Sequence, residues 1–247
     1  RFGSPAVNRR EHTEKIMELS LWTRLLLAVV VAFFISFAMT PIVKSFAVKI
    51  GAMDVPTEKR RVHDHPIPRM GGLAIFIGFL LSVVLFADIT QQVQGILLGA
   101  IIIVMVGAID DIISLPALVK LAGQIVAAGI AIWHGVIIEF FMNPNVFSNT
   151  TVIGVELLAL PITLLWIVGV TNAVNLIDGL DGLACGVSSI ASLTMFVVAL
   201  IVSEGNVAII LGALLGACIG FLPYNFNPAK IFMGDTGSQL LGYVLAT

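Results

Sequence analysis

Charged residues are scarce in this chain of 247 residues, where Lys, Arg, Asp and Glu together make up only 11%. A soluble domain carries about 25% charged residues, so this composition excludes an ordinary water-soluble globular protein. The net charge is −2, and no basic stripe with interleaved aromatic residues occurs, so no nucleic-acid partner is expected. Hydrophobic residues account for 58% of the sequence, which is typical of a chain dissolved mostly in lipid.

Cysteine is scarce as well, with only two residues of this type. Cys185 and Cys218 both lie in apolar, small-residue surroundings, where cysteines are more often buried and free than paired or bound to metal. No Cys/His pattern has the spacing of zinc ligands. Neither a disulfide framework nor a zinc centre is therefore expected.

Long apolar runs make up most of the sequence, and most of them approach the roughly 20 residues that a helix needs to cross a bilayer. The predicted spans are 21–39, 71–87, 95–109, 118–133, 157–174, 183–202, 207–222 and 239 onward. The chain is therefore predicted to be an all-α polytopic membrane protein with about eight transmembrane helices. Small residues such as Gly212 and Gly216 would allow neighbouring helices to pack closely.

The chain is divided into a tail and one domain, and the domain departs from the pattern of spans at two places. Residues 1–20 form a polar N-terminal tail, part of which is expected not to belong to the natural protein. Residues 21–247 are predicted to form one transmembrane domain. This domain is expected to be incomplete at its C-terminus, because an apolar run is still continuing at Thr247. Residues 136–155 are rich in β-branched residues broken by Asn and Pro, which predicts a small β-hairpin on the outer surface.

Basic residues indicate how the chain is oriented in the membrane. After Arg24, every Lys and Arg falls in loops on one side of the predicted spans. These residues are Lys44, Lys49, Lys59, Arg60, Arg61, Arg69, Lys120 and Lys230. The positive-inside rule makes this side cytoplasmic, although the basic residues of the N-terminal tail and Arg24 lie on the other side.

Five aspartates lie at cytoplasmic ends of spans that are far apart in the sequence. They are Asp110, Asp111, Asp178, Asp181 and Asp235. A single Asp at such a boundary is usually a helix cap, but five at one depth, with Asn172 and Asn175 nearby, indicate a polar site. Carboxylate oxygens without His or Cys suit Mg²⁺, and also Mn²⁺. Together with basic residues on the same side, they match the requirements of phosphoryl transfer.

At these residues the chain resembles the polyprenyl-phosphate N-acetylhexosamine-1-phosphate transferases. The resemblance is carried, in order along the chain, by residues 66–72, 107–111, 120–124, 172–183 and 228–238. It implies a Mg²⁺-dependent transferase that passes a sugar 1-phosphate from a UDP-N-acetylhexosamine to a polyprenyl phosphate, undecaprenyl phosphate in bacteria, and releases UMP. It also implies ten or eleven helices in the whole protein, a His-rich loop beyond Thr247, and a homodimer as a common assembly.

The resemblance also implies roles for individual residues. Asp110 and Asp111 resemble the pair that positions, or deprotonates, the lipid phosphate, and Lys120 resembles a group that neutralises phosphate. Because such a phosphate has a second pKa near 6, it is mostly ionised at pH 7, and positioning should matter more than base catalysis. Asp235 resembles a metal ligand, with Asp111 as a second one. The expected substrate-binding residues are Asn172, Asn175, Asp178, Asp181, Phe232, Arg69 and Lys230, with Phe232 stacking on uracil.

The segment around Arg69 distinguishes two branches of this family. Residues 63–69 resemble the GlcNAc-1-phosphate branch, whereas the pentapeptide branch usually has Thr where this chain has Arg69. The predicted function is transfer of N-acetylglucosamine 1-phosphate from UDP-GlcNAc to undecaprenyl phosphate at the cytoplasmic face of the bacterial cell membrane, for glycans of the teichoic acid or O-antigen type. Phospho-MurNAc-pentapeptide transfer is one alternative. An ion-coupled transporter is another, although it would carry carboxylates near mid-span.

Overall fold

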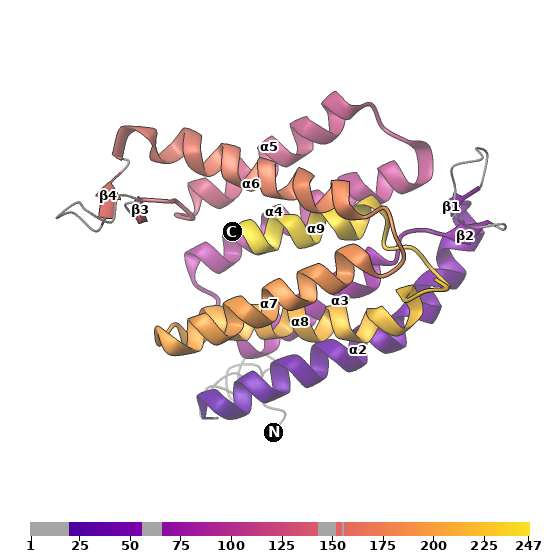
Figure 1. Ribbon diagram of the computed structural model, residues 1–247, viewed down its shortest axis with the longest axis horizontal. Helices are drawn as coiled ribbons and strands as arrows, with labels where there is room; N and C mark the ends of the chain where they lie inside the picture. Colours follow the sequence, from indigo (N-terminus) through magenta and orange to yellow (C-terminus); the bar gives the residue numbers. More distant parts are fainter. Residues whose placement is uncertain (1–19, 56–65, 143–151, 155) are drawn as a thin grey trace, which may run out of the picture.

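The computed structural model describes residues 20–55, 66–142, 152–154 and 156–247. The described part contains eight α-helices, which run back and forth through an elongated bundle (Figure 1). These are α2 (Leu21–Ile50), α3 (Gly72–Phe86), α4 (Gln91–Ile113), α5 (Ala117–Trp133), α6 (Ala159–Ile177), α7 (Leu183–Ile201), α8 (Gly205–Asn225) and α9 (Gly234–Ala246). The tail 1–19 and the predicted basic cluster 59–61 with His63 and His65 lie outside the described residues.

The helices confirm the prediction of an all-α polytopic membrane protein. Five of them, α2, α4, α6, α7 and α8, are long and apolar enough to cross a membrane, and α3 and α5 are shorter apolar helices. The predicted hairpin is also present, as the antiparallel pair β3 (Phe140–Met142) and β4 (Val152–Gly154), followed by the short 3-10 helix η1 (Glu156–Leu158). A second antiparallel pair, β1 (Met53–Asp54) with β2 (Ile67–Pro68), was not predicted.

The predicted end of the first span at residue 39 is wrong, because α2 continues through Pro41 to Ile50. Proline is more frequent in membrane helices than in soluble ones, so Pro41 does not have to end this helix. The hydroxyl of Thr40 donates to the carbonyl of Ser36 at 2.7 Å, and that of Ser45 donates to the carbonyl of Pro41 at 3.0 Å. The helix ends at Gly51, whose φ of 78° suits the left-handed conformation of a helix C-terminus.

Small residues bring the helices close together, as predicted. A Cβ on Gly216 of α8 would collide with the backbone of Val29 on α2, so only glycine permits this approach. Helix α9 lies at the centre of the bundle, packed against α3, α4, α6 and α7. A Cβ on Gly107 of α4 would likewise collide with the backbone of Thr236 in the first turn of α9. The polar first turn of α9 is thereby pressed against the end of α4.

The C-terminal ends of α2, α4 and α6 and the N-terminal end of α9 lie at one end of the bundle, beside β1 and β2 (Figure 1). The β3–β4 hairpin lies at the opposite end. Arg24, the basic residue that the orientation count left on the hairpin side, forms an ion pair with Asp88 at 2.9 Å. The aspartates in the last turn of α4, directly after α6 and in the first turn of α9 therefore lie at one end of the helices, as the sequence predicted.

Candidate functional site

The N-terminus of α9 is held by a carboxylate from another helix. Gly234 begins α9 with a φ of +72°, and the preceding residue provides no side-chain cap. Asp111, in the last turn of α4, accepts hydrogen bonds from the backbone N–H groups of Asp235 at 3.0 Å and Thr236 at 3.1 Å, and from the Thr236 hydroxyl at 2.6 Å. A carboxylate at a helix N-terminus satisfies otherwise unpaired N–H groups and interacts favourably with the helix dipole.

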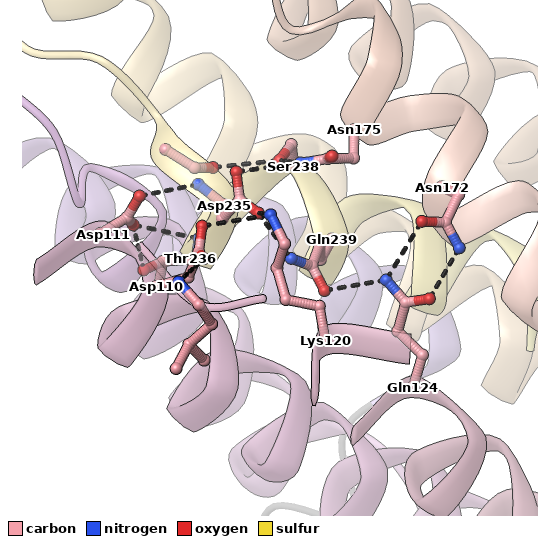
Figure 2. Close-up of polar contacts among 12 residues, drawn as sticks. Asp110, Asp111, Lys120, Gln124, Asn172, Asn175, Asp235, Thr236, Ser238 and Gln239 are labelled. Carbon is pink, nitrogen blue, oxygen red and sulfur yellow. Dashed lines mark hydrogen bonds and ion pairs between the residues drawn. The ribbon is translucent and has the colours of Figure 1, made fainter. Parts of the chain in front are cut away.

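Lys120 of α5 joins two aspartates from different helices (Figure 2). Its Nζ lies 3.0 Å from Oδ2 of Asp235 on α9 and 3.3 Å from Oδ2 of Asp110 on α4. The other carboxylate oxygen of Asp110 accepts a hydrogen bond from the backbone N–H of Leu115 at 2.6 Å. Lys120 therefore partly neutralises two carboxylates that would otherwise repel each other at the end of the bundle.

Amide side chains complete the surroundings of Asp235. Gln239, one turn further along α9, donates to Oδ2 of Asp235 at 2.8 Å. Asn175 of α6 donates to Oδ1 of Asp235 at 3.2 Å and to the hydroxyl of Ser238 at 2.8 Å. The carboxylate of Asp235 thus has partners from three helices, which fixes its position relative to the ends of α5, α6 and α9.

Arg69 connects the segment after β2 to the end of α4. Its Nε donates to the backbone carbonyl of Asp111 at 2.9 Å, and its Nη2 donates to that of Asp110 at 3.2 Å. A cation at a helix C-terminus is favourable because unpaired carbonyls and the helix dipole both attract it. The same segment pairs with the backbone of Phe232, whose N–H donates to the carbonyl of Pro68 at 2.8 Å.

Asp181 holds the loop that leads from α8 to Phe232. Its Oδ2 accepts hydrogen bonds from the side-chain amide of Asn227 at 3.1 Å and from the backbone N–H of Ala229 at 2.9 Å. Asn225, at the end of α8, donates to the carbonyl of Ile231 at 3.1 Å in the same loop. The loop is therefore tied at both ends by polar side chains.

A cavity of about 590 Å³ opens among these elements. A volume of this order suits a small-molecule ligand. Its lining combines carboxylates, an arginine, an aromatic ring and amides. The residues are Asp54, Arg69, Asp111, Asn175, Asp178, Gly179, Leu180, Asp181, Asn225, Asn227, Phe232, Gly234 and Asp235. Carboxylates thus face an arginine and an aromatic ring across one space, as expected for a site that takes a charged ligand with a flat ring.

Asp178 is the cavity carboxylate with the least compensation. It directly follows α6, and among the residues that the structure describes none donates a hydrogen bond to its side chain. Burial, together with the nearby carboxylates of Asp111 and Asp235, raises the pKa of Asp178 to about 7. An uncompensated carboxylate beside two others provides a place where a cation would be stabilised.

The cavity offers carboxylate oxygens to a divalent metal. Within the described residues, no three His, Cys, Asp or Glu side chains form a compact group of metal ligands. Mg²⁺ is commonly held by one or two carboxylates together with water and substrate phosphates, so such a group is not required. Asp178 and Oδ1 of Asp235 retain acceptor capacity in the cavity, whereas Oδ2 of Asp111 already accepts two hydrogen bonds from Thr236. The donor set therefore fits Mg²⁺ or Mn²⁺, with Asp235 and Asp178 as the better-placed carboxylates.

The predicted site residues do not all meet at the cavity. Those that line it are Arg69, Asp111, Asn175, Asp178, Asp181, Phe232 and Asp235. Lys120 lies next to the cavity, because it contacts both Asp235 and Asp110. Asn172 is not among the lining residues and instead pairs with Gln124, to which it donates at 2.6 Å. Lys230 is exposed, and it does not line the cavity either. The roles of these two residues, like those of the residues that line the cavity, stay predictions.

Sequence reasoning missed several residues of the site. Asp54, Asn225 and Asn227 line the cavity but lie outside the motif segments or at their edge. Thr236 and Gln239 bind the carboxylates of Asp111 and Asp235, and nothing in their residue types alone indicated this. Gln124 belongs to the segment 120–124 that carries the resemblance, which was the one available signal for its role.

Comparison with known proteins gives one family and several similar proteins. The family model described as glycosyl transferase family 4 matches residues 93–247. A probable undecaprenyl-phosphate N-acetylglucosaminyl 1-phosphate transferase of Bacillus subtilis is 46% identical over 228 residues, covering 90% of this chain and 62% of the relative. A decaprenyl-phosphate N-acetylglucosaminephosphotransferase of Mycobacterium tuberculosis is 40% identical, covering 86% of this chain and 56% of the relative.

A phospho-N-acetylmuramoyl-pentapeptide-transferase of Rubrobacter xylanophilus is 38% identical over 196 residues, covering 72% of this chain and 59% of the relative. The chain thus spans less than two thirds of the length of each of these three relatives. The family match covers more than half of the chain and includes Asp110, Asp111, Lys120 and Asp235. The chain belongs to glycosyl transferase family 4 and is a multi-pass membrane protein.

Proposed function

We propose that the full-length protein transfers N-acetylglucosamine 1-phosphate from UDP-GlcNAc to undecaprenyl phosphate and releases UMP. The observation that carries this proposal is the cavity in which Asp178, Asp235 and Arg69 meet the ring of Phe232 at one end of the helices. A nucleotide diphosphate needs cations for its phosphates and a flat surface for its base. The relatives with 46% and 40% identity are named for transfer of an N-acetylglucosamine phosphate group to a polyprenyl phosphate.

In the proposed reaction, an oxygen of the lipid phosphate forms a bond to the phosphorus that carries the sugar. The bond from that phosphorus to the bridging oxygen of UMP breaks, and UMP leaves. Bound Mg²⁺, held by Asp235 and Asp178, would supply charge neutralisation for the phosphates. Lys120 holds Asp235 and Asp110 in place and can neutralise negative charge that develops nearby.

Arg69 supports the proposal from the other wall of the cavity. A guanidinium has five N–H donors, of which two are used by the carbonyls of Asp110 and Asp111. The remaining donors are available to a phosphate of the donor nucleotide. Phe232, whose backbone is tied to Pro68 next to Arg69, would stack on uracil beside it.

We further propose that the protein lies in the bacterial cell membrane, with the cavity on the cytoplasmic side, where UDP-sugars occur. Lys44 and Lys49 belong to the C-terminal part of α2, Arg69 and Lys120 contact the aspartates of the site, and Lys230 lies in the loop before α9. Apart from Arg24, the described basic residues thus belong to the cavity end of the bundle, which agrees with the positive-inside rule. The product would start a glycan of the teichoic acid or O-antigen type. A homodimer stays a prediction from the family resemblance.

Two other functions compete with this one. Phospho-MurNAc-pentapeptide transfer uses the same chemistry, and a relative with that name is 38% identical. An ion-coupled transporter would need carboxylates along a path through the middle of the helices. The aspartates here lie at the helix ends, around a cavity at one end of the bundle, which favours an enzyme over a transporter.

The decisive experiment measures UMP release by the purified full-length protein. UMP should form from UDP-GlcNAc only when undecaprenyl phosphate and Mg²⁺ are both present. The same preparation is assayed with UDP-MurNAc-pentapeptide as the donor. A higher kcat/KM for the pentapeptide donor would assign the protein to the other branch, and no UMP from either donor would overturn the proposal.

A further inference from the structure

A chain of three amide side chains leads from α6 to Asp235 (Figure 2). Asn172 of α6 exchanges hydrogen bonds with Gln124 of α5, and Gln124 donates to Oε1 of Gln239 on α9 at 3.1 Å. Gln239 in turn donates to Oδ2 of Asp235 at 2.8 Å. Gln124 and Gln239 are 3% and 1% exposed, so water cannot readily replace these contacts. Buried polar networks of this kind stabilise one arrangement of side chains when every member is satisfied.

The direction of this chain of hydrogen bonds is fixed at both ends. At one end, Asn172 donates to the backbone carbonyl of Val168 at 2.8 Å, and a carbonyl can only accept. At the other end, the carboxylate of Asp235 can only accept from Gln239. The oxygen of Gln239 must then face Gln124, which must supply an N–H to it. Each amide can therefore adopt one orientation without placing two acceptors against each other.

This arrangement makes the two oxygens of Asp235 unequal. Oδ2 accepts from Gln239 at 2.8 Å and from Lys120 at 3.0 Å, so its acceptor capacity is used. Oδ1 accepts one longer hydrogen bond, from Asn175 at 3.2 Å. Because Asp235 and Asn175 both line the cavity, Oδ1 is the oxygen that retains capacity for a ligand there.

We propose that Gln124 and Gln239 are positioning residues, which hold Oδ2 of Asp235 so that Oδ1 is presented to a divalent cation in the cavity. The proposal rests on the proposed function, because it concerns how the same site takes its metal. Gln239 touches Asp235 directly, whereas Gln124 acts through Gln239. Groups that orient a metal ligand commonly affect metal affinity about 10- to 100-fold without touching the metal.

The variant Gln124→Glu tests this role because Glu has nearly the same shape but, when ionised, has no donor. Because burial favours a protonated Glu, which would keep a donor, the measurement is made at pH 8.5, where the ionised form is favoured. Gln239 would then have to turn its amide toward Glu, which places its oxygen against Oδ2 of Asp235. Mn²⁺ binding to the full-length protein, measured without substrates by electron paramagnetic resonance, should weaken about tenfold or more. An added negative charge alone would strengthen cation binding, so the expected change has the opposite sign to simple electrostatics.

Two further variants separate positioning from other effects. Gln124→Met removes the same hydrogen bonds but leaves Gln239 free to keep donating to Asp235, so Mn²⁺ binding should weaken much less than in Gln124→Glu. Gln94→Glu makes the same chemical change at an exposed position near the start of α4, at the other end of the bundle. It should bind Mn²⁺ as the parent protein does. Thermal midpoints of all four proteins show how much each variant loses in stability.

The outcomes are distinct. Weaker binding in Gln124→Glu than in Gln124→Met supports the proposal, even if both variants have equally lowered thermal midpoints. Unchanged Mn²⁺ binding in Gln124→Glu, or equal weakening in the two variants, overturns it and leaves the proposed function untouched. If the parent protein itself binds no Mn²⁺, the divalent-metal site of the proposed function fails, and this inference fails with it.

Discussion

The carboxylate of Asp111 accepts two hydrogen bonds from Thr236, one from the backbone N–H at 3.1 Å and one from the hydroxyl at 2.6 Å. The two residues lie on different helices and 125 positions apart in the sequence. A third bond, from the N–H of Asp235, completes a cap that α9 does not supply itself. Asp111 therefore has a structural task beside any contact with substrate, because it sets where α9 begins and where Asp235 points.

Replacing Asp111 with Asn should lower both stability and turnover. Asn offers one acceptor oxygen and an NH₂ group, which would face the N–H donors of α9. Loss of buried hydrogen bonds to a charged acceptor should cost about 2 to 3 kcal/mol. Thermal unfolding of the full-length protein in detergent measures this loss. Thr236→Val removes one of the three donors and should cost less, and equal stability of the parent and Asp111→Asn would contradict the capping role.

The helices could largely be predicted from the sequence, but their ends could not. Hydropathy located all eight helices of the described part, because lipid requires long apolar stretches. It placed the start of the last span at residue 239, whereas α9 begins at Gly234. The first turn of α9 is polar, and its N–H groups are satisfied by Asp111, which is too distant in sequence for a local pattern to reveal.

The site could be predicted in its residue types but not in its contacts. The spacing of the aspartates and the family resemblance indicated which carboxylates gather at one end of the bundle. They could not show that Arg69 binds the carbonyls at the end of α4, or that Asp181 binds a loop. Such contacts depend on how helices pack in three dimensions, so residue type and spacing alone do not determine them.

Lys120→Met should nearly abolish turnover while leaving the helices intact. The change removes the cation that lies within 3.3 Å of both Asp110 and Asp235, and it keeps much of the side-chain volume. Removing one group that stabilises developing charge commonly lowers kcat about 100- to 1,000-fold. UMP release measures the loss. Lys49→Met, at an exposed position on α2, should turn over like the parent protein, and a near-normal kcat for Lys120→Met would exclude Lys120 from the site.

Variants of Asp181 should distinguish a contact with substrate from a role in holding the loop before Phe232. An Asn at this position could still accept from Asn227 and Ala229 through its oxygen, so Asp181→Asn should keep KM for UDP-GlcNAc within about threefold of the parent value. Asp181→Ala loses both bonds and should raise this KM about tenfold or more. Steady-state kinetics with UDP-GlcNAc measure both. Equal damage in the two variants would show that the charge of Asp181 acts directly.

Asp178 should make the stability of the metal-free protein depend on pH. Its pKa is raised from 3.8 to about 7, chiefly by burial and further by Asp111 and Asp235. The native state therefore holds a proton on Asp178 at pH values where the unfolded chain has lost it, so unfolding releases a proton between about pH 4 and pH 7. The contribution of Asp178 to stability is therefore most favourable below this window and becomes less favourable as the pH rises through it.

Asp178→Asn removes this dependence. With EDTA present, the thermal midpoint of Asp178→Asn minus that of the parent should increase from pH 4.5 to pH 7 and stay level above pH 7.5. A difference that is constant over this range would show that burial and the neighbouring carboxylates do not raise the pKa of Asp178.

In a second series of thermal unfolding measurements, Mg²⁺ replaces EDTA. Because a cation binds the ionised carboxylate, Mg²⁺ should raise the thermal midpoint of the parent protein more at pH 8 than at pH 5. At both pH values Mg²⁺ should raise the midpoint of Asp178→Asn less than that of the parent protein.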